Sequence, residues 1–142
     1  MTIAAILERK GREVVSIDGS ARVSEAVALL ADRRIGALPV LAGGRVAGIV
    51  SERDVIYCLR RDGAAVLDWP VERLMTAPAI TAEPQTAVLA ALSQMTRRRI
   101  RHLPVVEGGE LVGIVSIGDL VAFRLARIEE EAEAMRAYIQ SA

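Results

Sequence analysis

Residues 34–55 read RIGALPVLAGGRVAGIVSERDV, and residues 99–120 read RIRHLPVVEGGELVGIVSIGDL. The two stretches align without a gap at an offset of 65 positions, and 12 of their 22 residues are identical. Unrelated segments of ordinary composition would share roughly one or two residues over this length. The chain is therefore one supersecondary unit used twice, and this repeat decides the fold.

The composition indicates a small protein with an aliphatic core. Of 142 residues, 52% are hydrophobic but only 3% are aromatic, so Val, Ile, Leu and Ala must fill the interior. This length suits one compact domain, or two small halves that share a core. The 18 basic and 18 acidic residues cancel, so the net charge favours no polyanionic partner.

Cysteine usage and hydropathy indicate where in the cell the protein is found. Cys58 is the only cysteine, so the chain forms neither an internal disulfide nor an all-cysteine metal site. No apolar run approaches the ~20 residues of a membrane span. Charged residues follow Leu7 too soon for a signal-peptide core. We therefore expect a soluble, cytoplasmic protein that requires no metal or cofactor.

Each copy of the repeat begins with the same two signals. A short β-prone run comes first, at 14–17 and again at 79–81. An apolar stripe with helical spacing follows, formed by Val23, Ala26, Val27 and Leu30 in one copy and by Val88, Ala91, Leu92 and Met95 in the other. Arginines close both predicted helices, where cations suit the carboxyl-terminal dipole.

Two strands and a second helix complete each copy. The strands are expected at 38–42 and 45–50, and again at 103–107 and 110–115. A Gly-Gly pair lies between the strands of each couple and favours a hairpin. Ser51 and Ser116 end the hairpins and suit the caps of the following helices. The predicted fold is α/β (α+β), with two tandem β-α-β-β-α repeats packed in pseudo-two-fold symmetry.

We expect three segments along the chain. Residues 1–66 form the first repeat with a helix at its start, 67–124 the second repeat, and 125–142 a helical extension. The last helix, from about 119 to 139, carries a heptad seam of Val121, Leu125, Ile128, Ala132, Met135 and Ile139. The seam predicts either a helix that lies on its own domain or a self-association surface, and we favour the second.

The motif Gly-Ile-Val-Ser-x-x-Asp holds the strongest chemical signal and occurs at 48–54 and 113–119. The strand ends at the serine, and free backbone N–H groups of the following helix favour anions there. The serine hydroxyl can donate to a phosphate, and the ionised Asp54 or Asp119 can accept from a diol such as ribose. The alternative is a purely structural cap, a variant of the capping box. Two copies at one offset favour binding.

These features resemble the cystathionine β-synthase domain pair, the CBS or Bateman module, over nearly the whole chain. The resemblance rests on the tandem repeat, the Leu-Pro-Val strands at 38–40 and 103–105, the Gly-Gly turns and both Gly-Ile-Val-Ser-x-x-Asp motifs. The run Leu7-x-x-Lys10-Gly11 and the tail with Arg136-x-Tyr138-Ile139 resemble small stand-alone bacterial members.

The resemblance implies a regulatory module that binds AMP, ADP, ATP, NAD(H) or S-adenosylmethionine in two clefts between the repeats. Aspartates would hold the ribose, serines would lie beside phosphate, and the Leu-Pro-Val strands and the motif valines would meet adenine. The first site would comprise Ser16, Ala37, Leu38, Pro39, Val50, Ser51, Arg53 and Asp54. The second would comprise Thr81, Arg99, Arg101, His102, Leu103, Pro104, Val115, Ser116 and Asp119.

The two copies differ immediately before Leu-Pro. The first has Gly36-Ala37 there, and the second has Arg101-His102, where family members often place a basic residue for phosphate. We therefore predict unequal affinities, with the second cleft better for a phosphorylated ligand. A phosphate beside His102, the only histidine, would raise its pKa.

Three other functions have weaker support. The sequence offers no nucleophile-base pair or metal-ligand spacing, so we expect no enzyme. The basic cluster 97–102 could contact RNA, but zero net charge and scattered aromatics disfavour nucleic acid. A homodimeric scaffold without ligand is the third. We favour a ligand-sensing homodimer, through CBS-CBS packing and the last helix, that acts on a separate protein effector.

Overall fold

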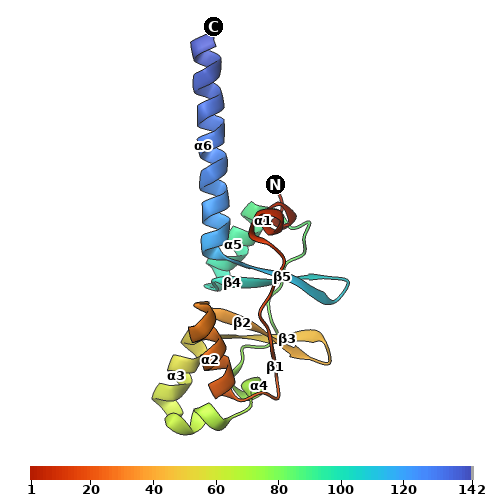
Figure 1. The fold of residues 1–142 in the computed structure, drawn as a ribbon, viewed down its shortest axis with the longest axis vertical. Coiled ribbons are helices and arrows are strands. Elements are labelled where there is room, and N and C mark those ends of the chain that lie inside the picture. The colour runs from red at the N-terminus through yellow and green to blue at the C-terminus, as the bar shows by residue number, and fades with distance from the viewer. Residues whose placement is uncertain (142) are drawn as a thin grey trace.

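The fold repeats one arrangement of secondary structure, and the computed structural model describes residues 1–141 of it (Figure 1). The first half contains α1 (Ile3–Lys10), β1 (Ile17–Asp18), α2 (Val23–Arg33), β2 (Ala37–Ala42), β3 (Arg45–Ser51) and α3 (Glu52–Asp62). A 3-10 helix (Ala64–Asp68) and α4 (Val71–Leu74) lead into the second half. That half contains α5 (Val88–Arg98), β4 (His102–Glu107), β5 (Glu110–Ser116) and α6 (Ile117–Ser141).

The two hairpins form as the sequence predicts. β2 and β3 pair antiparallel with Leu38 opposite Val50, and β4 and β5 pair with Leu103 opposite Val115. Both glycines of each turn adopt positive φ, at 58° and 78° for Gly43 and Gly44, which allows the tight connection. Arg34 and Arg99, 65 positions apart, both end their helices in the left-handed conformation.

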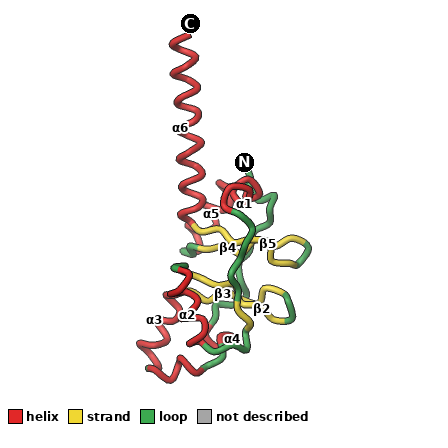
Figure 2. The backbone as a smooth tube through the Cα atoms, in the orientation of Figure 1, coloured by secondary structure: helices red, strands yellow, loops and turns green. Residues whose placement is uncertain are grey.

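The first strand of each repeat is shorter than expected. β1 covers only Ile17–Asp18 and pairs in parallel with β2. In the second repeat, the corresponding segment makes a single bridge between Ala82 and Val105. The sheets therefore have three strands and two strands (Figure 2).

The leading helices are exchanged between the halves. Ile3, Ile6 and Leu7 of α1 are buried in the core of the second repeat, whereas Val71 and Leu74 of α4 are buried in the core of the first. This differs from the expected grouping of the amino-terminal helix with residues 1–66. Each hairpin sheet needs an apolar cover, and the segment that precedes a repeat provides it for the other half.

The long helix α6 begins in the second core and then leaves the body of the protein (Figures 1 and 2). Leu120 is its only fully buried residue. Val121, Leu125, Ile128, Met135 and Ile139 of the predicted seam are 44–64% exposed. Within the single chain, this apolar seam therefore lacks a partner.

Candidate functional site

The first Gly-Ile-Val-Ser-x-x-Asp motif forms a capping box at the β3–α3 junction. The backbone N–H of Ser51 donates to Asp54 Oδ2 at 2.9 Å, and the backbone N–H of Asp54 donates to Ser51 Oγ at 3.2 Å. This pairing fixes the carboxylate at the first turn of α3. The cap therefore orients Asp54 through Oδ2 and leaves Oδ1 for a partner outside the motif.

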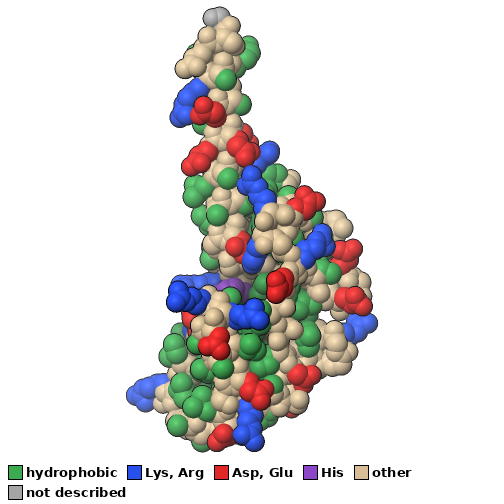
Figure 3. Space-filling view, in the orientation of Figure 1, with side chains coloured by type: hydrophobic (Ala, Val, Ile, Leu, Met, Phe, Trp, Pro, Cys, Tyr) green, Lys and Arg blue, Asp and Glu red, His purple; other side chains and the backbone are tan. Residues whose placement is uncertain are grey.

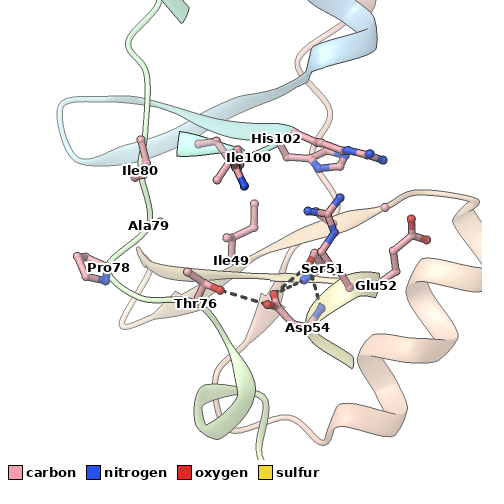
Figure 4. Close-up of a pocket in the computed structure, with 15 residues that line it drawn as sticks. Ile49, Ser51, Glu52, Asp54, Thr76, Pro78, Ala79, Ile80, Ile100 and His102 are labelled. Carbon is pink, nitrogen blue, oxygen red and sulfur yellow. Dashed lines mark hydrogen bonds between the residues drawn. The ribbon is translucent and has the colours of Figure 1, made fainter. Parts of the chain in front are cut away.

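Thr76 reaches Asp54 from the segment that connects α4 to the second repeat. Its Oγ1 donates to Asp54 Oδ1 at 3.3 Å (Figure 4). Its backbone pairs with Ile49 through bonds of 2.9 and 3.0 Å. Gly48 permits this close approach, since a Cβ there would lie 2.6 Å from the Thr76 carbonyl oxygen.

A cavity of about 240 Å³ opens beside Asp54, between the two halves. This volume is near the lower limit of roughly 300–1,000 Å³ for ligand pockets, so it suits part of one small ligand. Its apolar wall consists of Ile49, Pro78, Ala79, Ile80 and Ile100. Ser51, Asp54 and Thr76 form a polar cluster on one side (Figure 4). A flat apolar group with an attached diol fits this distribution.

Basic side chains from both repeats border the same cavity. Arg53 comes from the first motif, Arg99 and Arg101 come from the segment before β4, and His102 is the first residue of β4. Figure 3 shows Lys and Arg side chains gathered near the histidine at the waist of the molecule. Arg99, Arg101 and His102 were predicted at the second motif, but in the structure they line the cleft of Asp54. The hairpins face each other, so the start of β4 meets the end of β3.

Of the other residues expected in the first site, only Ala37 lines the cavity. Leu38, Pro39 and Val50 are buried, with Leu38 and Val50 in the first core, and do not line the cavity, whereas Ala37 does. Ser16 borders a separate shallow groove with Arg12 and Glu110. The first-strand residues that face Asp54 are thus Ala79 and Ile80 of the second repeat. Residue order alone does not reveal this wall, because it comes from the other half of the chain.

The second motif forms the same cap as the first. The backbone N–H of Ser116 donates to Asp119 Oδ2 at 2.9 Å, and the Asp119 N–H donates to Ser116 Oγ at 3.1 Å. Leu103 and Val115 are core residues, Pro104 is also buried, and neither they nor Thr81 line the cavity beside Asp54. Lys10 Nζ lies 2.7 Å from Asp119 Oδ2. The Asp119 carboxylate of the second motif is therefore already paired with the Lys10 ammonium group.

The electrostatics of Asp119 follow from that pairing. Partial burial by itself would raise the pKa of the Asp119 carboxyl, but hydrogen bonds from Lys10 and Ser116 outweigh it and lower the pKa below its usual value. Asp119 is therefore ionised at neutral pH and paired with an ammonium group.

His102 lies between the two motifs. It pairs with Ser116 across β4 and β5, and its ring approaches Gly36, where a Cβ would be 3.1 Å from His102 Cε1. Burial, then the positive charge of Lys10, lower the pKa of His102 from its ordinary 6.5, although Asp119 and Glu52 oppose the shift. The imidazole is therefore neutral at pH 7 in the free protein.

Much of the cavity wall was not predicted from the sequence. Ile49, Glu52, Thr76, Pro78–Ile80 and Ile100 border the cavity but were assigned no role. Thr76 and Pro78 precede the recognisable repeat, and only the β-bridge to Ile49 brings them to the site. Ala79 and Ile80 could have been predicted, because they adjoin Thr81 in the segment that the offset of 65 matches to the first strand.

Residues 1–141 show neither a candidate metal site nor a candidate membrane span. These residues contain no cluster of three or more His, Cys, Asp or Glu side chains suited to a metal ion. None of the helices among them has the length and apolarity that crossing a bilayer requires.

Comparison with known proteins gives consistent matches. The CBS domain family matches residues 8–61 and 71–126. The CBS domain-containing protein CBSX3, mitochondrial, of Arabidopsis thaliana is 36% identical, over 98% of this chain and 72% of that protein. A solved structure of a protein with CBS domains from Burkholderia ambifaria is 38% identical, with a TM-score of 0.83 over 89% of this chain and 95% of that one.

A more distant structure contains ligands. The CBS domain pair of protein MJ0100 was solved in complex with 5′-methylthioadenosine and S-adenosylmethionine. It is 23% identical, with a TM-score of 0.79 over 89% of this chain and 98% of that one, a likeness of fold. With two matched repeats covering most of its length, this chain belongs to the CBS-domain family and carries the paired repeats that serve as a regulatory module.

Proposed function

We propose that this protein senses an adenosyl ligand in the cleft beside Asp54 and transmits its occupancy to a separate protein effector. The observation that carries the proposal is the convergence of an oriented carboxylate, an apolar wall and basic side chains on one cavity. The ligands of the MJ0100 pair, which shares the fold, support the adenosyl class.

Each part of such a ligand has a chemically suitable neighbour. Asp54 Oδ1 would accept hydrogen bonds from ribose hydroxyls, with Thr76 beside it. The base would lie against Ile49, Ile80 and Ile100. A phosphate would meet Arg53 or the arginines near β4, whose fixed positive charge suits bidentate contacts.

A thermal-shift panel tests the proposal. Purified protein shown free of bound nucleotide is screened against AMP, ADP, ATP, NAD⁺, NADH, S-adenosylmethionine and 5′-methylthioadenosine. A ligand at about 100 times its Kd should add roughly 2.7 kcal/mol to the free energy of unfolding. No shift with any compound would contradict the proposal and favour the ligand-free scaffold. Salt-resistant retention of RNA would favour the nucleic-acid alternative.

Binding of a phosphorylated ligand should depend on pH through His102. The free protein holds His102 neutral, and a nearby phosphate would raise its pKa, so binding takes up a proton. Affinity for AMP should therefore increase a few-fold as the pH falls from about 8.5 to about 7, a range in which the phosphate stays largely dianionic. Calorimetric titration measures this, with 5′-methylthioadenosine, which lacks phosphate, and His102→Gln as controls. An equal pH dependence in either control would contradict the assignment.

We further propose that the seam of α6 pairs with the same seam of a second copy, in a homodimer that CBS-CBS packing also supports. The heptad places Leu125, Ala132 and Ile139 at a positions and Val121, Ile128 and Met135 at d positions. In a parallel, in-register pair, Arg124 faces Glu129 of the other copy, and Glu131 faces Arg136. Both pairs of opposite charges attract each other. In an antiparallel dimer, Glu129 would instead face Glu129 of the other copy, and Glu131 would face Glu131, and these like charges repel.

Single cysteines can establish this orientation. In a Cys58→Ser background, Ile128→Cys should form an intermolecular disulfide under mild oxidation, because parallel in-register pairing brings identical d positions together. Ala134→Cys, at an outward position of the same helix, is the matched control and should stay monomeric on non-reducing gels. Equal cross-linking of both variants, or of neither, would contradict the parallel pair.

A further inference from the structure

The two Asp motifs receive different groups from the preceding segment. At the first, the neutral Thr76 hydroxyl donates to Asp54 at 3.3 Å, and the Thr76 N–H donates to Ile49 O at 2.9 Å. At the second, Lys10 Nζ makes both contacts, donating to Asp119 Oδ2 at 2.7 Å and to Ile114 O at 2.8 Å. An ammonium group thus stands where the first cleft has a short hydroxyl side chain.

A difference in chain length produces this exchange. The Ile3 N–H donates to Thr86 O at 2.9 Å, as the Val71 N–H donates to Ala21 O at 2.7 Å, so Ile3 and Val71 are equivalent at an offset of 68. Leu7 lies against Gly113 as Met75 lies against Gly48, again at an offset of 68.

The offset returns to 65 where the repeats resume, at Val14 and Ala79. Six residues, Glu8–Glu13, therefore connect Leu7 to the first repeat, whereas three, Thr76–Pro78, connect Met75 to the second. The three extra residues extend α1 to Lys10 and carry its side chain to Asp119. The first cleft has no such extension.

The Lys10–Asp119 pair is held more firmly than an ordinary surface pair. The two side chains are 35% and 29% exposed, and the bond is short and charge-assisted. Ribose hydroxyls would have to displace an ammonium group from Asp119. The residues at the positions of Arg101 and His102 in the other repeat are Gly36 and Ala37, which offer no charge to hold a phosphate in compensation.

We propose that Lys10 is an internal substitute for ligand that keeps the second cleft closed, so each chain holds one adenosyl ligand, beside Asp54. This inference rests on the proposed function of the first cleft. It reverses the expectation that the second cleft binds phosphorylated ligands better.

Equilibrium dialysis with AMP tests the inference by stoichiometry. The wild-type protein should bind one AMP per chain at concentrations that saturate the first cleft, with any second site at least tenfold weaker. Lys10→Met removes the ammonium group but keeps an unbranched side chain, and should bind two. Lys10→Arg keeps the charge and should bind one. Arg9→Met is the matched control, because Arg9 pairs with Glu130 rather than Asp119, and should also bind one.

Each outcome of the dialysis experiment supports or refutes the role of Lys10. Two equal sites in the wild type, or one site in both wild type and Lys10→Met, would overturn the inference. Binding of AMP by Lys10→Met alone, abolished by Asp119→Asn, would support the closed cleft while refuting the proposed function of the first. No binding by either protein would refute both. Lys10→Gln provides a second uncharged variant, and circular dichroism verifies that each variant is folded.

Discussion

Asp54→Asn should weaken binding of an adenosyl ligand about 10- to 100-fold while the protein stays folded. Hydrogen bonds to a charged group contribute roughly 1.5–3 kcal/mol, which corresponds to this range of affinity. The amide retains one carbonyl oxygen to accept from the Ser51 N–H, so the cap of α3 survives. Calorimetric titration gives the Kd, and thermal unfolding should show a small change in stability.

Asp119→Asn is the matched control for this variant. It makes the same chemical change in the same cap, 65 positions later, but at the motif that Lys10 occupies. Affinity at the first cleft should stay within about twofold of wild type. If Asp119→Asn weakened binding as much as Asp54→Asn, ligand would have to contact both motifs, and the assignment of one cleft would be wrong.

Gly48→Ala should destabilise the protein by about 2 kcal/mol and also weaken ligand binding. The new methyl group would lie 2.6 Å from the Thr76 carbonyl oxygen and 2.8 Å from Met75 Sδ. The carbonyl belongs to the bridge with Ile49 and cannot move without breaking it. Overpacking of this kind typically costs 1–3 kcal/mol. Chemical denaturation measures the loss of stability. Calorimetric titration should show a higher Kd, because a displaced Thr76 no longer supports Asp54.

Gly113→Ala is the corresponding change in the second repeat and should cost less than half as much. There the methyl group would meet Leu7 Cδ2 at 2.7 Å, the far end of a side chain that can rotate. Since no backbone bridge is affected, ligand affinity at the first cleft should be unchanged. Equal destabilisation by both variants would show that the Thr76 backbone is not the rigid obstacle.

The repeat allowed most of the fold to be predicted. The hairpins at β2–β3 and β4–β5, their Gly-Gly turns and the serine caps all follow from local sequence signals, and each is present in the structure. The short first strands were overestimated, because β-prone residues such as Val14 and Val15 have no neighbour to pair with at that point. Family membership was also predicted correctly from the motifs.

The composition of the clefts could not be predicted in the same way. Arg101 and His102 follow Arg99 in the second repeat, so sequence proximity assigned them to Asp119, yet they line the cavity of Asp54. Val50 and Val115 were expected against a ligand, but strand alternation turns their side chains into the cores. Which groups converge depends on how the two hairpins face each other.

The sequence by itself determined the repeated unit, its caps and the two carboxylates, because these depend on interactions within a few residues of each motif. Only the tertiary structure decided which carboxylate is paired with an ammonium group. Asp54 and Asp119 lie in nearly the same local sequence, but Thr76 meets one and Lys10 meets the other. Those partners are 22 and 109 positions away, and long-range packing of α4 and α1 brings them into contact.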